Sequence, residues 1–145
     1  MRPWGSTFSE HVKAHLPDFD GVPPRIHAGL VRSYIAGALA RPLPREDAER
    51  LAEPWLSPKD QRAISAQFAQ ADEVRTAEVE PLFGTVHRPA VVLWGEDDPW
   101  IPMARGQALR DALPKGMPFR SLPGLGHLPQ SDAPETVVAL ALEVL

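Results

Sequence analysis

Apolar residues recur at helical spacing through the first half of the chain, and single prolines separate the periodic segments. Proline fits the first turn of a helix, where its missing N–H would have no partner, but it disrupts a helix interior. We therefore expect four short helices, over residues 7–16, 23–41, 44–53 and 57–71. The fourth should fade in the charged stretch that precedes Pro81.

The pattern changes at Pro89, where a continuous β-branched and apolar run follows. This run predicts a strand over residues 90–94 that is buried on both faces. A helix over 103–113 and a weaker strand over 119–122 come next. The segment Asp132-Ala133-Pro134-Glu135 has the spacing of a capping box and predicts the start of a final helix.

The loop before Pro89 is the best boundary between a helical region, residues 1–85, and a strand-helix-strand-helix region, residues 86–145. Two parallel strands cannot form a stable sheet alone, because parallel sheets are covered on both faces and contain several strands. Strong helix caps upstream argue against missed strands in the first region. The sequence therefore predicts an α/β fold in which this chain supplies part of a larger sheet.

The amino-acid composition limits the classes of molecule that the protein is expected to bind. The 145 residues carry a formal net charge of -4, with Lys and Arg dispersed among Asp and Glu, so we expect neither nucleic-acid nor membrane binding. The absence of cysteine excludes disulfides and fits a reducing, cytoplasmic location. No apolar stretch is as long as the hydrophobic part of a signal peptide or as a membrane span. We expect a small-molecule or protein partner and no cofactor.

An acid and an imidazole follow the two predicted strands. Asp98 lies in Trp94-Gly95-Glu96-Asp97-Asp98-Pro99, and His127 lies in Gly126-His127-Leu128-Pro129. A carboxylate bonded to one ring nitrogen fixes the tautomer of a histidine that removes a nucleophile's proton with the other. Spacing from the strand favours Asp98 over the adjacent Asp97. The alternative stays open that Asp98 only forms an Asx turn and His127 is a surface residue.

Other candidate residues carry weaker signals. Trp100, Trp4 and Phe8 could line an apolar substrate pocket, although large aromatic residues more often serve packing. His11 and His15 have helical spacing, but no third ligand is evident, so we predict no metal site. No Gly-x-Ser-x-Gly segment, nor a Cys or Asp equivalent, occurs in the sequence.

With these motifs, residues 89–145 resemble the C-terminal portion of the α/β-hydrolase superfamily. In that family a strand ending in Trp-Gly-x-x-Asp precedes a helix, a short strand and a Gly-His turn. Asp98 matches the family's catalytic acid and His127 its catalytic histidine. The helical region looks like the family's cap domain. The resemblance implies a partial α/β-hydrolase fold: a helical cap followed by two parallel strands and two helices, without the nucleophile half.

The resemblance implies a hydrolase of small, largely apolar ester or related substrates, with His127 as general base and Asp98 as its orienter. Because the nucleophile elbow is missing, we expect a truncated hydrolase that is inactive alone and needs an N-terminal half. Whether the chain is an enzyme therefore stays open. The alternative is a non-catalytic interaction protein, or a homo-oligomer, that covers the open sheet edge at Val91-Val92-Leu93-Trp94.

Overall fold

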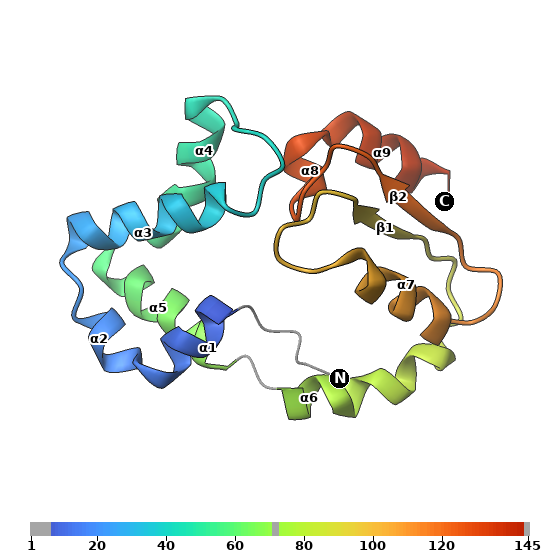
Figure 1. The fold of residues 1–145 in the computed structure, drawn as a ribbon, viewed down its shortest axis with the longest axis horizontal. Coiled ribbons are helices and arrows are strands. Elements are labelled where there is room, and N and C mark those ends of the chain that lie inside the picture. Colours follow the sequence, from blue (N-terminus) through green and yellow to red (C-terminus); the bar gives the residue numbers. More distant parts are fainter. Residues whose placement is uncertain (1–6, 71–72, 144–145) are drawn as a thin grey trace. The chain divides into compact units, whose positions relative to one another are not determined.

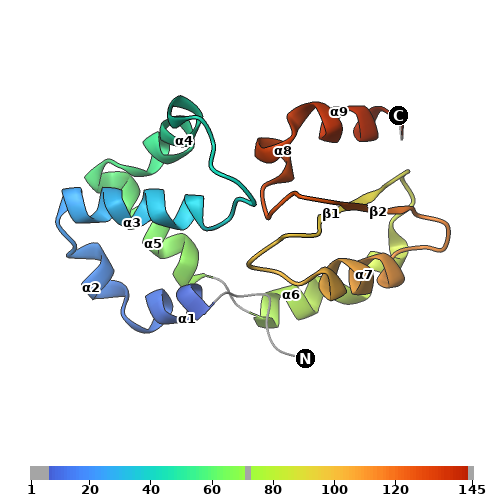
Figure 2. The same cartoon turned by 45° about the horizontal axis from the view of Figure 1, so that its top comes forward.

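The chain forms two compact units in a computed structural model that describes residues 7–70 and 73–143. The helical unit comprises Met1–Gly37 and Pro44–Thr76, and the sheet unit comprises Ala38–Leu43 and Ala77–Leu145. Figures 1 and 2 show the elements of both units. Whereas the sequence suggested one boundary after residue 85, the contacts place the segment Ala38–Leu43 with the sheet unit.

The elements follow one another along the chain in a helical run and then an alternating run. In chain order they are α1 (Thr7–Ala14), α2 (Leu16–Asp20), α3 (Pro24–Ala36), α4 (Arg45–Ala52), η1 (Glu53–Trp55), α5 (Pro58–Ala69), α6 (Glu73–Val79), η2 (Glu80–Thr85), β1 (Val92–Gly95), α7 (Met103–Ala112), β2 (Phe119–Leu122), α8 (Pro129–Asp132) and α9 (Pro134–Leu142). No described helix has both the length and the apolar character needed to cross a lipid bilayer.

Proline and serine start the helices of the helical unit as the pattern predicted. The first turn of α3 contains Pro24, and Pro58 opens α5 directly after its N-cap residue. The hydroxyl of that residue, Ser57, accepts a hydrogen bond from the Asp60 amide at 3.3 Å, as an N-cap side chain does. The first helix was predicted over residues 7–16, but α1 ends at Ala14 and Pro17 lies in the first turn of the short helix α2.

An aromatic cluster fills the helical unit. The Phe8 ring lies 5.0 Å from that of Tyr34 and 5.5 Å from that of Phe68, measured between ring centroids. The buried Gln61 side chain donates to the carbonyls of Phe19 and Val22, both at 2.9 Å, and so ties α5 to the turn between α2 and α3. The stripes of apolar residues therefore converge on one core.

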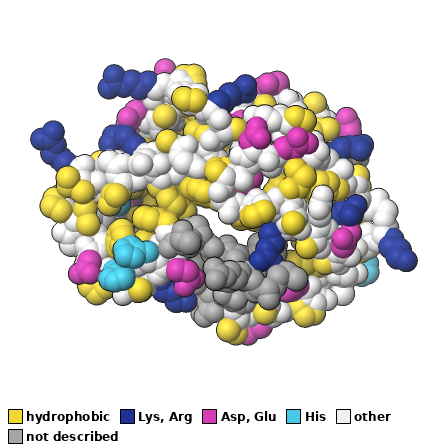
Figure 3. All heavy atoms as spheres, viewed as in Figure 1, with side chains coloured by type: hydrophobic (Ala, Val, Ile, Leu, Met, Phe, Trp, Pro, Cys, Tyr) yellow, Lys and Arg dark blue, Asp and Glu magenta, His cyan; other side chains and the backbone are white. Residues whose placement is uncertain are grey.

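An ion pair joins α3 to α4 on the surface of the helical unit. The guanidinium of Arg32 donates to both carboxylate oxygens of Glu49, at distances of 2.8 to 3.1 Å. These hydrogen bonds hold the pKa of the Glu49 carboxyl below its usual value. On the face drawn in Figure 3, basic and acidic side chains are scattered among hydrophobic ones.

The sheet unit is built on two parallel strands, with Val92 opposite Phe119 and Gly95 opposite Leu122. Successive strand residues point to opposite faces. Leu93 packs with α9 against a buried cluster that includes Leu122, whereas the next residue, Trp94, meets α7. In Figure 2 the strands accordingly lie between α7 and α9. This is the predicted partial α/β-hydrolase fold: helices, then two parallel strands with their helices.

Two further predictions about the helices were wrong. The charged stretch before Pro81 forms the helix α6, because its Glu, Arg and Ala residues favour a helix and a high charge does not prevent one. The capping box at Asp132 does not form either, since α9 has Ala133 as its N-cap residue and no side-chain cap. The Asp132 carboxylate instead has partners in other loops, which are described below.

Two helical glycines offer a matched test of the packing. A Cβ at Gly106 of α7 would lie 2.5 Å from ring carbons of Trp94, whereas a Cβ at Gly29 of α3 would meet nothing within 4 Å. Gly106→Ala should therefore destabilise the protein by roughly 1–3 kcal/mol, as overpacking does. Gly29→Ala should stabilise it by about 0.4–1 kcal/mol. Urea denaturation measures both values; equal effects of the two substitutions would contradict the packing of Trp94 on α7.

Candidate active site

The carboxylate of Asp98 is held in the turn that follows β1. Its Oδ1 atom accepts hydrogen bonds from the amides of Trp100 and Ile101, both at 2.9 Å. The far end of the turn is fixed by the Trp94 indole, which donates to the Ile101 carbonyl at 3.2 Å. The Asp98 side chain is only 5% exposed. Two backbone donors therefore fix the acid and leave its second oxygen for another partner.

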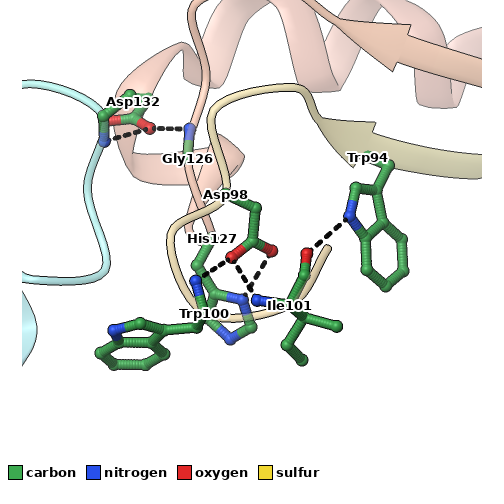
Figure 4. A network of polar contacts seen from close by, with 8 residues as sticks. Trp94, Asp98, Trp100, Ile101, Gly126, His127 and Asp132 are labelled. Atoms are coloured by element: carbon green, nitrogen blue, oxygen red, sulfur yellow. Dashed lines mark hydrogen bonds and ion pairs between the residues drawn. The ribbon is translucent and has the colours of Figure 1, made fainter. Parts of the chain in front are cut away.

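That partner is His127, on the turn that follows β2. Its Nδ1 atom lies 2.9 Å from Oδ2 of Asp98, and the imidazole side chain is 28% exposed. An ionised carboxylate can only accept, so Nδ1 carries the hydrogen and Nε2 is the nitrogen left for another group. Figure 4 shows the carboxylate of Asp98 bonded to the imidazole and to the two amides.

The histidine turn approaches two other stretches of backbone closely. A Cβ at Gly95 would lie 2.3 Å from the Gly126 carbonyl oxygen, and a Cβ at Gly126 would lie 2.6 Å from the Ala40 amide nitrogen. The His127 amide donates to the Ala38 carbonyl at 2.8 Å. Glycine is therefore required on both sides of the site for the turns to meet.

The structure brings together three of the five predicted site residues. The Trp100 ring lies 4.9 Å from the His127 ring, between centroids, and is tilted by 46°. Phe8 belongs to the aromatic cluster of the helical unit, and Trp4 lies outside the described residues. Among the residues that the structure describes, no three His, Asp or Glu side chains gather as a metal site would require.

The sequence missed a second buried carboxylate beside this site. Asp132 accepts hydrogen bonds from the Gly126 amide at 2.7 Å and the Ala40 amide at 3.4 Å. Ala40 precedes Asp132 by 92 residues in the chain, so no local spacing could have indicated the contact. The capping-box spacing pointed to a different role for the same acid.

The fold of the chain matches solved structures. An α/β-hydrolase fold protein from Burkholderia ambifaria is 38% identical, with a TM-score of 0.91, over 99% of this chain and 53% of that one. This chain belongs to the α/β-hydrolase superfamily. It spans about half the length of that solved chain.

Two further solved structures share the α/β-hydrolase fold at lower identity. A thermophilic esterase from Thermogutta terrifontis, solved with malate bound, is 21% identical with a TM-score of 0.68, over 98% of this chain and 51% of that one. A membrane phospholipase A is 20% identical with a TM-score of 0.59, over 81% of this chain and 37% of that one. No family model matches this α/β-hydrolase chain, and no curated protein matches it.

The hydrogen-bond network of Asp98 can be tested by comparing the stability of variants at Asp98 and at the adjacent Asp97. Asp98→Ala removes the acceptor of two amides and one imidazole, and each hydrogen bond to a charged group contributes about 1.5–3 kcal/mol. The substitution should therefore lower the free energy of unfolding by roughly 3 kcal/mol or more. The control Asp97→Ala alters an exposed residue and should change it by less than about 0.5 kcal/mol. A urea titration compares the two, and equal losses would refute the network.

Proposed function

We propose that this chain supplies the acid and the histidine of a hydrolase's catalytic triad, Asp98 and His127. The observation that carries the proposal is the hydrogen bond between Nδ1 of His127 and Oδ2 of Asp98 at 2.9 Å. It leaves Nε2 to act as a general base, as the histidine of an acyl-transfer triad requires. The two turns also follow the carboxyl ends of parallel strands, where open α/β sheets hold their sites.

In the proposed reaction, Nε2 of His127 takes the proton of a nucleophile's hydroxyl while the oxygen attacks the carbonyl carbon of an ester. The resulting imidazolium then gives that proton to the departing alkoxide, which leaves an acyl-enzyme. Water repeats the two steps and releases the acid and the nucleophile. Asp98 accepts from two amides and from the ring N–H, and so holds the imidazole with Nε2 toward the reaction.

Small and largely apolar esters are the substrates we propose. The Trp100 ring beside His127 offers an apolar surface next to the reacting nitrogen. The helical unit contains a hollow lined mainly by aromatic and aliphatic side chains, with His27 and Ser65 as its polar members. The esterase and the phospholipase with the same fold favour ester chemistry over the other reactions of the superfamily.

The nucleophile is the part of the triad that this sequence does not identify. It contains no Gly-x-Ser-x-Gly segment, and no Cys or Asp equivalent of that elbow. We propose that a segment outside these 145 residues supplies the elbow and the oxyanion donors, either in the same polypeptide or as a separate chain. Catalysis would then require both parts, and this chain alone would be inactive.

Ester hydrolysis by the combined protein tests the proposal. Hydrolysis of p-nitrophenyl esters is measured for three samples. They are the 145-residue chain by itself, a longer protein translated from the same reading frame extended upstream, and the chain mixed with the first half of the Burkholderia ambifaria protein. We expect turnover only when an elbow is present. His127→Gln should then lower kcat by about 10²–10⁴-fold, the contribution of a general base.

Adjacent residues supply the controls for this assay. Asp98→Asn should lower turnover strongly, because the amide cannot stabilise an imidazolium, whereas Asp97→Asn should leave it unchanged. Turnover that persists in both His127→Gln and Asp98→Asn would overturn the proposed triad.

A second candidate function is self-association through the sheet unit. Each of the two described strands has one strand neighbour, so each has an edge that no described strand covers. The exposed face of α9 also carries the apolar side chains of Val138 and Leu142. Open edges and apolar patches are typical of surfaces that another chain covers.

Light scattering after gel filtration over a hundredfold concentration range tests this candidate. Self-association predicts a mass that rises with concentration toward a dimer, and Val138→Lys with Leu142→Lys should shift this transition to higher concentration. The matched control places Lys at two exposed polar positions of the helical unit, Gln67 and Gln70, where no apolar surface is lost. A monomer at every concentration excludes self-association.

A further inference from the structure

The carboxylate of Asp132 joins two segments that are far apart in the sequence. Its Oδ2 atom accepts from the Gly126 amide at 2.7 Å and from the Ala40 amide at 3.4 Å. The Arg41 guanidinium donates to the backbone carbonyl of the same aspartate. Figure 4 shows Asp132 bonded to Gly126 on the side of the turn away from Trp94. One acid thus holds the histidine turn against the segment Ala38–Leu43.

The burial of the Asp132 carboxylate costs free energy that its hydrogen bonds must offset. Asp132 is 5% exposed, and its Oδ1 atom finds no hydrogen-bond partner among the described residues. A buried polar atom without a partner costs free energy, and a buried charge costs more. A role as a helix cap does not explain the burial, because α9 has no side-chain cap. The Asp132 carboxylate is therefore explained by the amides that it binds.

The amides around Asp132 determine the orientation of the His127 side chain. Two consecutive N–H groups of the turn are fixed, that of Gly126 by Asp132 and that of His127 by the Ala38 carbonyl at 2.8 Å. Fixing successive peptide groups leaves little freedom for φ and ψ between them. The direction of the Cα–Cβ bond of His127, and with it the approach of Nδ1 to Asp98, follows from these two hydrogen bonds.

We propose that Asp132 is a positioning residue, which clamps the histidine turn to the segment Ala38–Leu43 so that the His127 imidazole faces Asp98. The segment leaves α3 and enters α4, so the clamp couples the orientation of His127 to the connection between these two helices. As a statement about catalysis the inference rests on the proposed triad. The geometry itself can be measured without any turnover.

NMR spectroscopy of the chain tests the clamp directly. The nitrogen chemical shifts of the His127 ring report the hydrogen bond at Nδ1, and amide hydrogen exchange reports the bond at Gly126. In Asp132→Ala the Gly126 amide should exchange roughly tenfold faster or more, because a buried bond to a charged acceptor is lost. The His127 ring shifts should move toward those of Asp98→Asn, although Asp98 itself is intact.

Two further variants make the result specific. Asp132→Asn keeps an acceptor oxygen and should give intermediate ring shifts, which is rescue by the conservative variant. Asp111→Asn changes an exposed acid that pairs with Arg110 and should alter neither signal. If Asp132→Ala does not fold, Asp132→Asn is compared with the wild type instead. The His127 ring shifts and the exchange rate of the Gly126 amide then test the positioning role.

Unchanged His127 shifts in a folded Asp132 variant whose Gly126 amide exchanges faster would overturn the positioning role and leave Asp132 as a purely structural acceptor. This outcome differs from a failure of the proposed function. In that case the combined protein shows no turnover dependent on His127, while the ring shifts still respond to Asp132.

Discussion

The close approach of three backbone segments is the constraint on which the candidate site depends. The end of β1 touches the histidine turn at Gly95, and the histidine turn touches the segment Ala38–Leu43 at Gly126. Any Cβ at either glycine would lie within 2.6 Å of a backbone atom, closer than real Cβ atoms come. Because the main chains meet without side chains between them, their amides and carbonyls can bond directly across the turns. The side chains of Asp98 and His127 then meet as a consequence.

Two buried acids organise these turns, and they divide the backbone donors between them. Asp98 accepts the amides that close its own turn, whereas Asp132 accepts amides from two other segments. An ionised carboxylate is an acceptor only, so a buried one needs several donors around it. Here backbone N–H groups supply most of them. Hydrogen bonds between loops therefore hold the site together, and the imidazole of His127 donates to Asp98 beside the two amides.

The parts of this arrangement that the sequence predicted are those with a local signal. β2 was predicted at its observed bounds, and β1 and α7 within a few residues, because hydrophobic runs and their period lie within each segment. The meeting of Asp98 with His127 followed from the edge shared by parallel strands. By contrast, the partners of Asp132 lie at positions 40 and 126, and backbone amides carry no residue-type signal. The helix α6 was missed because the charged stretch was expected only to end the helix before it.

The turn role and the proposed triad role of Asp98 exclude each other in neither geometry nor chemistry, because they use different oxygen atoms. Oδ1 forms the turn with the amides of Trp100 and Ile101, and Oδ2 faces the imidazole. An asparagine could accept the two amides with its single oxygen and would close the turn without a buried charge. Only a carboxylate also stabilises a positively charged histidine next to it. The turn alone therefore does not explain an acid at this position, and the pairing with His127 does.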